Sequence, residues 1–191
     1  MADTQKVTYG KPKIGGAVSV APLGTELPTD ALTELSLEFS NLGYISEDGL
    51  TNENSPETEN IKAWGGDVVL VTQTDKEDTF GFKLIEALNV AVLKFIYGAD
   101  NVSGDIDTGI KVKANAKELE PVSIVVDMVV QSALKRIVIP NAKITEVAEI
   151  EYKDDDAVGY DVTVQAVPNT DGDTHEEYII MANAQEGEST E

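Results

Sequence analysis

Alternation of apolar and polar residues recurs along this chain and restricts the folds open to it. Residues 144–152 approximate the alternation, and residues 160–165 repeat it. Because successive side chains of a strand point to opposite faces, a period of two predicts half-buried β-strands. The acidic run 154–156 lies between the two segments and suits a hairpin loop, so an antiparallel strand pair is expected here.

One segment has a helical period instead. Leu84, Leu88, Val92 and Phe95 recur at intervals of three or four residues, and Gly98 suits the end of a helix. The sequence therefore predicts one long helix at about 83–97, without alternating strands and helices. The expected fold class is mainly β: an antiparallel β-sandwich or barrel with this helix on its flank. The expected strands are 17–20, 35–39, 42–45, 67–73, 79–82, 109–114, 122–130, 135–139, 144–152, 160–167 and 177–182.

The chain is expected to form a single β domain at 14–182 with polar extensions. Residues 1–13 are predicted to be a flexible N-terminal arm, and residues 183–191 an acidic C-terminal tail. Residues 47–62 combine five acidic residues with few apolar ones, which predicts a long polar loop. Trp64, the only tryptophan, is interpreted as a hydrophobic anchor for the base of that loop.

The charge of the chain argues against some partners. The net charge is −21 and the pI about 4.2, whereas proteins that bind nucleic acid usually carry the opposite sign. An acidic surface repels DNA and anionic membranes. The first residues show no signal peptide, and no apolar run approaches the roughly 20 residues of a membrane span, so no membrane association is expected.

The residues that carry chemistry in proteins are sparse here. His175 is the only histidine and the chain has no cysteine, so histidine–cysteine zinc sets are not expected. We interpret His175 as a surface residue in a charged turn. Asp154, Asp156 and Gly159 match three places of a calcium loop, but Gln165 stands where that loop needs glutamate. Turn function is the better interpretation, and we predict no catalytic residue, no cofactor and no metal.

Several segments together resemble a known family. They are residues 15–16, 21–30, 42–50, 63–67 and 136–143, followed by the hairpin that ends at Pro168. In order and spacing they are similar to the major tail tube proteins of siphovirus-type bacteriophages, which have long non-contractile tails. The resemblance implies a structural protein that is not an enzyme and has no cofactor. Its copies would form hexameric rings that stack into a hollow tube through which viral DNA passes into the host.

The resemblance also implies partners and a location. The partners would be further copies of the chain, the tape measure protein, the tail terminator and distal tail or baseplate proteins. Viral DNA would pass through the lumen without specific binding. The protein would reside in the tail of the virion after assembly in the cytoplasm of the host bacterium.

Contacts between rings are expected from the polar loop and the arm, because long polar segments can become ordered on contact with a neighbouring copy. The candidate assembly residues are Asp48, Leu50, Asn52, Glu53, Asn54, Pro56, Glu57, Trp64, Lys11 and Lys13. The overall charge further predicts a net negative lumen.

Three alternatives remain open from the sequence. The first is another ring-forming virion protein, such as a tail terminator or the tube of a sheathed tail. The second is a secreted β-sandwich adhesin or carbohydrate-binding module, against which the absence of a signal peptide and of cysteines counts. The third is an acidic hydrolase with an undetected carboxylate pair.

Overall fold

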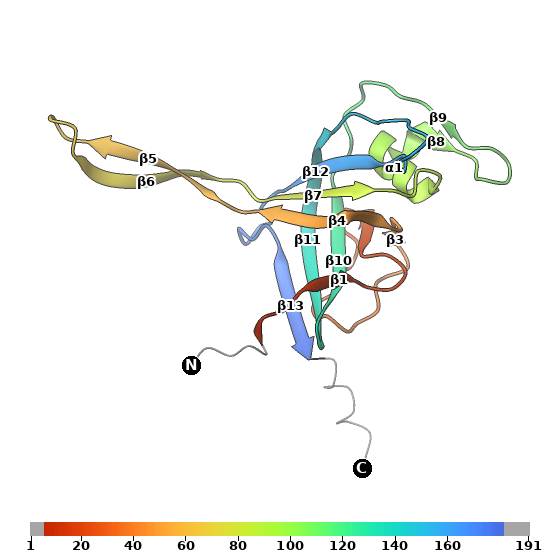
Figure 1. Ribbon diagram of the computed structural model, residues 1–191, viewed down its shortest axis with the longest axis horizontal. Helices are drawn as coiled ribbons and strands as arrows, with labels where there is room; N and C mark the ends of the chain where they lie inside the picture. Colours follow the sequence, from red (N-terminus) through yellow and green to blue (C-terminus); the bar gives the residue numbers. More distant parts are fainter. Residues whose placement is uncertain (1–5, 182–191) are drawn as a thin grey trace, which may run out of the picture.

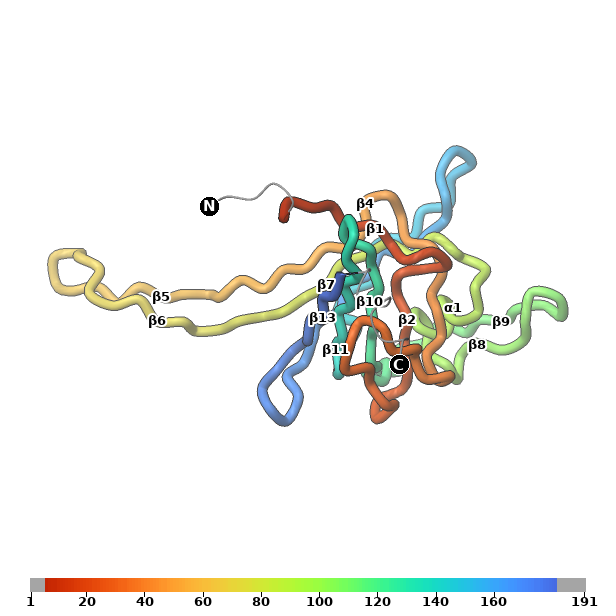
Figure 2. Tube along the Cα trace, turned by 90° about the horizontal axis from the view of Figure 1, so that it is seen from below, coloured from red at the N-terminus to blue at the C-terminus, as the bar shows by residue number. Residues whose placement is uncertain are grey.

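The computed structural model of the protein describes residues 6–181 of the 191 (Figure 1). The predicted acidic tail at 183–191 and the first five residues of the predicted arm lie outside this range. A body of β-strands with one short helix carries a narrow two-stranded hairpin that projects far to one side (Figures 1 and 2). The expected fold class, mainly β and antiparallel with one flanking helix, is confirmed.

Two long strands run through the middle of the body. β10 (Val122–Val130) and β11 (Ala133–Val147) pair antiparallel from Val130↔Ala133 to Val122↔Ala142. Gln131 in the turn between them has a φ of 58°, the left-handed conformation that tight hairpin turns use. The apolar run 122–130 gave the bounds of β10 correctly because every residue of this strand is buried or half-buried, so its pattern is continuous rather than alternating.

On its outer edge, each long strand pairs with two different neighbouring strands. β2 (Val18–Pro22) and β1 (Gly10–Pro12) pair with successive parts of β10, while β12 (Tyr160–Ala166) and β13 (Glu176–Met181) pair with successive parts of β11. One half of the long pair therefore belongs to a four-stranded sheet, β1-β10-β11-β13. The other half belongs to the sheet that encloses the core.

The enclosing sheet curls back on itself. Its order is β3-β2-β10-β11-β12-β7-β4, where β3 is Ser40–Asn41, β7 is Thr79–Leu84 and β4 is Ile45–Glu53. The two end strands, β3 and β4, follow each other directly in the chain and are joined by residues 42–44. Leu42 in this link is completely buried, and its amide donates to the Val18 carbonyl at 2.9 Å. The curl gives the body a barrel-like core.

The helix packs one face against the core of the curled sheet and is shorter than predicted. α1 spans Val90–Tyr97, and its buried side chains include Phe95, whose ring stacks on Phe82 at 6.5 Å. Asn89 begins the helix by accepting a hydrogen bond from the Ala91 amide, and Gly98 ends it at a φ of 91°. The predicted start at 83 is wrong because the alternation of Phe80, Phe82 and Leu84, all buried in β7, decides the structure there.

The segment 23–39 crosses the outer face of the sheet without forming a strand. Residues 35–39 were expected to be one, but they form an irregular turn. The side chain of Asp30 accepts hydrogen bonds from the amides of Leu32 and Thr33, which closes a local turn. Beyond the helix, the short elements η2 (Ala99–Asn101), β8 (Val102–Ser103) and β9 (Lys111–Val112) form a small lobe, so the strand expected at 109–114 is reduced to two residues.

The segment 47–62 was predicted to be a polar loop. This prediction is wrong, because the segment consists mostly of strands. β4 occupies its first part and pairs with β7, while β5 (Pro56–Lys62) pairs with β6 (Val68–Lys76) to form the projecting hairpin. Every residue of β5 is exposed. Its sequence therefore does not alternate between apolar and polar residues, because such alternation arises when one face of a strand is buried. Its backbone hydrogen bonds to β6 make it a strand, and these do not depend on the side chains.

Candidate assembly surfaces

The projecting hairpin ends in a tight turn that presents one large aromatic residue. The amide of Gly66 donates to the Ala63 carbonyl at 3.0 Å, and the amide of Ala63 donates to the Asp67 carbonyl at 2.8 Å. Gly65 and Gly66 have φ values of 120° and 100°, which residues with a side chain rarely adopt. Trp64 sits in this turn with an exposed fraction of 106%. The seven residues of β5 at about 3.3 Å each place this turn roughly 23 Å from the start of the hairpin.

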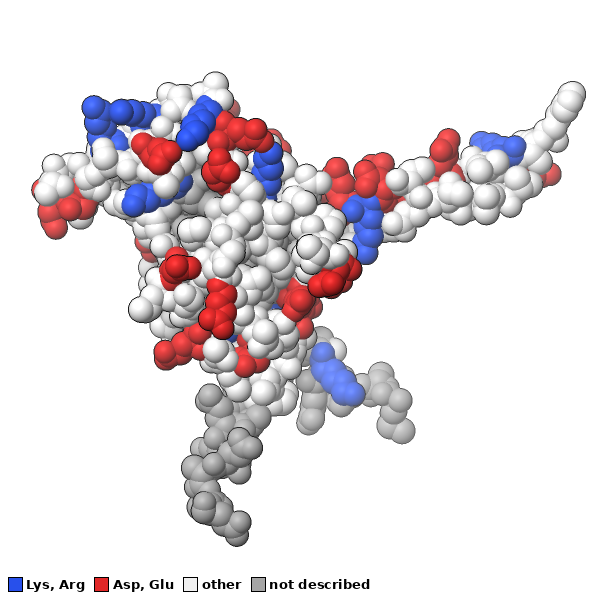
Figure 3. Space-filling view, turned by 180° about the vertical axis from the view of Figure 1, so that it is seen from behind, with Lys and Arg blue, Asp and Glu red and all other residues white. Residues whose placement is uncertain are grey.

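The outer half of the hairpin is apolar on both faces. Ile61 and Leu70 are cross-strand partners and share one face, while Val69 and Val71 point to the other. These side chains are about half exposed, and the charged residues in the same part of the hairpin are Glu59, Lys62 and Asp67. Figure 3 shows acidic and basic side chains along the hairpin. Single exposed apolar residues are ordinary, but a cluster of them marks a contact surface. A surface that is apolar on both sides needs a partner on both sides.

The ten candidate assembly residues do not form one loop. Asp48, Leu50, Asn52 and Glu53 lie in β4, which belongs to the body. Asn54, Pro56 and Glu57 form the root of the hairpin, and Trp64 lies at its far end. The interpretation of Trp64 as an anchor for the base of a loop is wrong, because the hairpin pairing carries it as far from the body as the chain allows.

The other two candidates lie beside the four-stranded sheet. Lys11 belongs to β1 and its ammonium group lies 5.2 Å from the centre of the Tyr9 ring, while Lys13 lies 3.5 Å from the Asp127 carboxylate. The predicted arm is therefore a strand at Gly10–Pro12 rather than a free segment. Pairing with the open edge of β10 satisfies its backbone groups whatever its side chains are.

The root of the hairpin is fixed by a buried carboxylate that the sequence did not reveal. Asp78, 1% exposed, lies between β6 and β7 and accepts hydrogen bonds from Asn52 at 2.8 Å and from Thr174 at 2.5 Å. Nδ1 of His175 lies 2.5 Å from the same carboxylate, and its ring packs edge-on against Phe80 at 5.3 Å. The expectation that His175 is a surface residue is wrong, because the fold brings it to a partner 97 residues away.

The environment of Asp78 keeps its carboxylate charged. Burial by itself would raise its pKa, but the hydrogen bonds from Thr174, Asn52 and His175 outweigh burial, so the pKa lies below the ordinary 3.8. This carboxylate therefore stabilises the folded state above pH 3.8, and the stabilisation is lost as the pH falls through the lowered pKa.

Asp78→Asn is expected to lower the free energy of unfolding by about 1–3 kcal/mol at pH 7, because donors gathered around a carboxylate then face an amide. The difference from the unsubstituted protein should narrow as the pH falls below 3.8. Urea unfolding at pH 7 and at several acidic pH values measures both effects. Asp75→Asn, on the exposed strand β6, is the matched control. Equal stability of the two variants at pH 7 would show that the cluster does not hold the root.

A second buried polar group fastens the segment 23–39 to the sheet. Arg136 is 1% exposed, and its guanidinium donates to both carboxylate oxygens of Asp127 at 2.6 and 3.0 Å. The same group donates to the carbonyls of Asp30 and Thr33 at 3.1 and 2.7 Å. The guanidinium thus satisfies two backbone carbonyls that have no strand partner.

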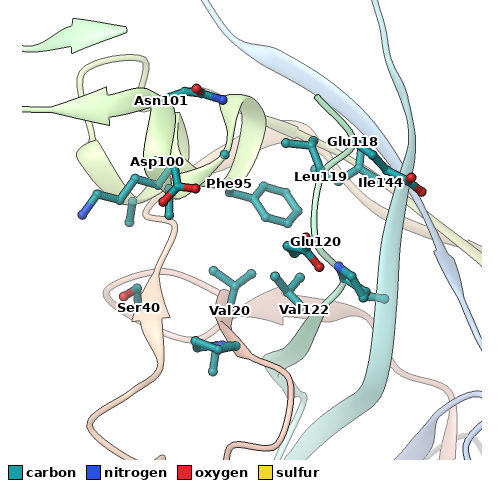
Figure 4. A pocket seen from close by; sticks show the side chains of 18 of the residues that line it. Val20, Ser40, Phe95, Asp100, Asn101, Glu118, Leu119, Glu120, Val122 and Ile144 are labelled. Carbon is teal, nitrogen blue, oxygen red and sulfur yellow. The ribbon is translucent and has the colours of Figure 1, made fainter. Parts of the chain in front are cut away.

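A cavity of about 440 Å³ opens beneath α1 (Figure 4). The helix α1 lies on the side of the body away from the hairpin (Figure 1). The apolar lining of the cavity comes from β2, α1, the segment before β10, β10 itself and β11: Val20, Phe95, Leu119, Val122 and Ile144. Charged side chains stand around its mouth: Glu38, Lys94, Asp100, Lys117, Glu118 and Glu120.

Between residues 6 and 181, no three side chains of histidine, aspartate or glutamate converge in a way that could hold a metal ion. No helix in this range is long and apolar enough to cross a membrane. The acidic run 154–156, considered above as a calcium loop, lies in the loop between β11 and β12, where Asp156 is 3.8 Å from the ammonium of Lys83.

The fold and these surfaces define a structural subunit whose projecting hairpin, open sheet edges and apolar cavity are available to other protein chains. The family described as phage tail tube protein matches residues 12–189, and the chain belongs to this family. It is a structural component of a phage tail and not an enzyme, which excludes the hydrolase alternative. No curated protein sequence matches the chain.

Proposed function

We propose that this chain polymerises as stacked hexameric rings into the hollow tube of a siphovirus-type tail, and that the tube conducts viral DNA into the host. The observation that carries the proposal is the β5–β6 hairpin. It projects from the body, carries apolar side chains on both faces of its outer half, and is left exposed by the rest of residues 6–181. A two-stranded hairpin alone is marginally stable in water, so contact with neighbouring copies would stabilise it.

The contact made by the hairpin would be heterologous and would not close into a ring. A hairpin at one end of the molecule and a body at the other are different surfaces, so their contact is head-to-tail and can repeat without limit. The candidate residues Asn54, Pro56, Glu57 and Trp64, which follow the hairpin from root to tip, would lie in contacts between rings. Asp48, Leu50, Asn52 and Glu53 would support the root.

Closure of a ring needs a second contact, and the four-stranded sheet β1-β10-β11-β13 offers it. Within the described chain, the outer edges of β1 and β13 pair with no further strand. Unpaired edges are templates for pairing with another chain. Pairing of β13 in one copy with β1 of the next would continue the sheet around the ring, and would place Lys11 and Lys13 at the boundary between copies.

The charge of the chain suits a conduit for DNA. A net charge of −21 per copy is repeated in every subunit, and carboxylates that line a lumen repel phosphates, so the genome would pass without binding. The tape measure protein, the tail terminator and distal tail proteins would be its partners, and assembly would take place in the cytoplasm of the host bacterium. A basic lumen in a structure of the tube would overturn the charge argument.

Electron microscopy of the purified protein tests the proposal. Concentrated protein, alone and seeded with distal tail complexes, is expected to form long hollow tubes with regular cross-striation, because the head-to-tail contact does not close. Closed single rings would favour a tail terminator, and tubes that recruit a contractile sheath would favour a sheathed tail. Protein that stays monomeric even when seeded would contradict self-assembly.

A further inference from the structure

We propose that Trp64 of one copy inserts into the cavity beneath α1 of a neighbouring copy, so that this cavity is the receptor for the hairpin tip. The inference rests on the proposed self-assembly and adds the receiving site. It begins with exposure: the only tryptophan of the chain lies at the end of a hairpin, where no other described residue covers its side chain. A tryptophan that becomes buried at an interface contributes a large apolar area and typically dominates the contact.

The cavity matches this side chain in size and chemistry. Phe95, Val20 and Val122 surround a space of about 440 Å³, which lies within the range of sites that bury small ligands (Figure 4). The rest of its apolar wall comes from Leu119 and Ile144. The ring of Phe95 faces the space and offers an aromatic partner to an entering indole.

The placement of the two surfaces permits the contact to repeat. The hairpin projects from one side of the body, while α1 and the cavity lie on the other, along the longest axis of the molecule (Figures 1 and 2). The tip of a chain cannot reach its own cavity, but a copy displaced along this axis can present its cavity to it. Such a contact is heterologous and leads to an open assembly.

The charges beside Trp64 complement those at the mouth of the cavity. Lys62 and Asp67 flank the tip, and Glu120 and Lys94 stand at the mouth. Among the ion pairs of the described residues, none involves any of these four side chains. By contrast, Lys117 and Glu118 at the same mouth are paired with Asp100 and Lys143. Outside these ion pairs the tip has one charge of each sign, and the mouth has Lys94 together with two acids, Glu38 and Glu120, so two complementary pairs can form.

A second apolar hollow, around Leu88 and Tyr152, is the competing receptor. It is shallower and wider, and its apolar residues are largely exposed, so it would leave much of an indole in water. The deeper cavity beneath α1 is therefore the better receptor. Leu88 provides a matched control, since it precedes the same helix without lining the cavity.

The experiment uses the fluorescence of Trp64, which is unambiguous because the chain has no other tryptophan. On assembly, its emission is expected to move to shorter wavelength and quenching by acrylamide to fall several-fold. Trp64→Ser should raise the critical concentration for tube formation by at least about tenfold, as loss of an interface hot spot does. Ala91→Leu, which fills the cavity from α1, should have the same effect, and Leu88→Ser should change it less than about twofold.

A charge exchange tests the register of the contact. Lys62→Glu and Glu120→Lys are each expected to raise the critical concentration, and the double variant should restore it, because the pair is re-formed with opposite signs. Two results would overturn this inference and leave the proposed function intact. In one, acrylamide quenches Trp64 in the tubes as strongly as in the monomer; in the other, the Ala91→Leu variant forms tubes as readily as the unsubstituted chain. Failure of the unsubstituted chain to form any tube, even when seeded, would overturn both.

Discussion

Replacement of Arg136 by methionine is expected to lower the free energy of unfolding by about 3–5 kcal/mol, the range for breaking a buried ion pair on one side. Asp127 would keep a charge with little solvent, and the carbonyls of Asp30 and Thr33 would lose their donor. Since domains are typically stable by 5–15 kcal/mol, this is a large share of the total. The midpoint of urea unfolding measures it.

Two further variants show whether the effect comes from the charge of Asp127, which would keep only the exposed Lys13 as an ion partner. Lys117→Met removes an ion pair with Asp100 whose partners are both well exposed, and should cost less than about 1 kcal/mol. The double variant Arg136→Met, Asp127→Leu should recover part of the loss, because an apolar pair of similar size replaces the charged one. A loss below about 1 kcal/mol for Arg136→Met alone would show that the segment 23–39 is held by other contacts.

Excision of the outer hairpin is expected to abolish tube formation while leaving a folded subunit. Pro56 and Lys76 are cross-strand partners, so replacing residues 57–75 by Asn-Gly joins the strands through a two-residue turn that suits a hairpin. β4, β7 and the Asp78 cluster remain, and the free energy of unfolding should change by less than about 1 kcal/mol, because residues 57–75 lie outside the core. Electron microscopy and urea unfolding measure the two effects.

A mixture with intact chain provides the control. The excised subunit still has its body surface, so it should accept the hairpin of an intact copy and then stop growth, which shortens the tubes in proportion to its share. Tubes of normal length and striation formed by the excised chain alone would refute the role of the hairpin.

The sequence predicted strands well where one face or both are buried. Residues 160–165 alternate because Tyr160, Val162 and Val164 enter the core, and β12 spans Tyr160–Ala166 as a result. Burial along its whole length likewise let the sequence predict the bounds of β10. The start of β13 was predicted to within a residue although most of its residues are exposed. Fold class could therefore be predicted from side-chain periodicity, which records burial.

Elements that do not bury one face could not be predicted in this way. β5 is exposed along its whole length, so its sequence resembles a polar loop although its backbone is paired. Contacts between distant residues were equally hidden, since nothing near His175 indicates Asp78. Gly65 and Gly66 indicate a turn beside Trp64, but they do not indicate that this turn lies far from the body. Residue type and spacing indicate local structure. The positions of His175 and Trp64 depend instead on the pairing of strands that are distant in the sequence.

The hairpin and the cavity lie on opposite sides of the body, so a filament can form in which the hairpin of each copy enters the cavity of the next. Such a filament has a direction, since one end displays unoccupied hairpins and the other displays unoccupied cavities. A protein that starts the filament and a protein that stops it must then differ in shape, because one has to offer a cavity and the other a projecting strand pair. The length of a tail built from these subunits would be fixed by events at two chemically different ends.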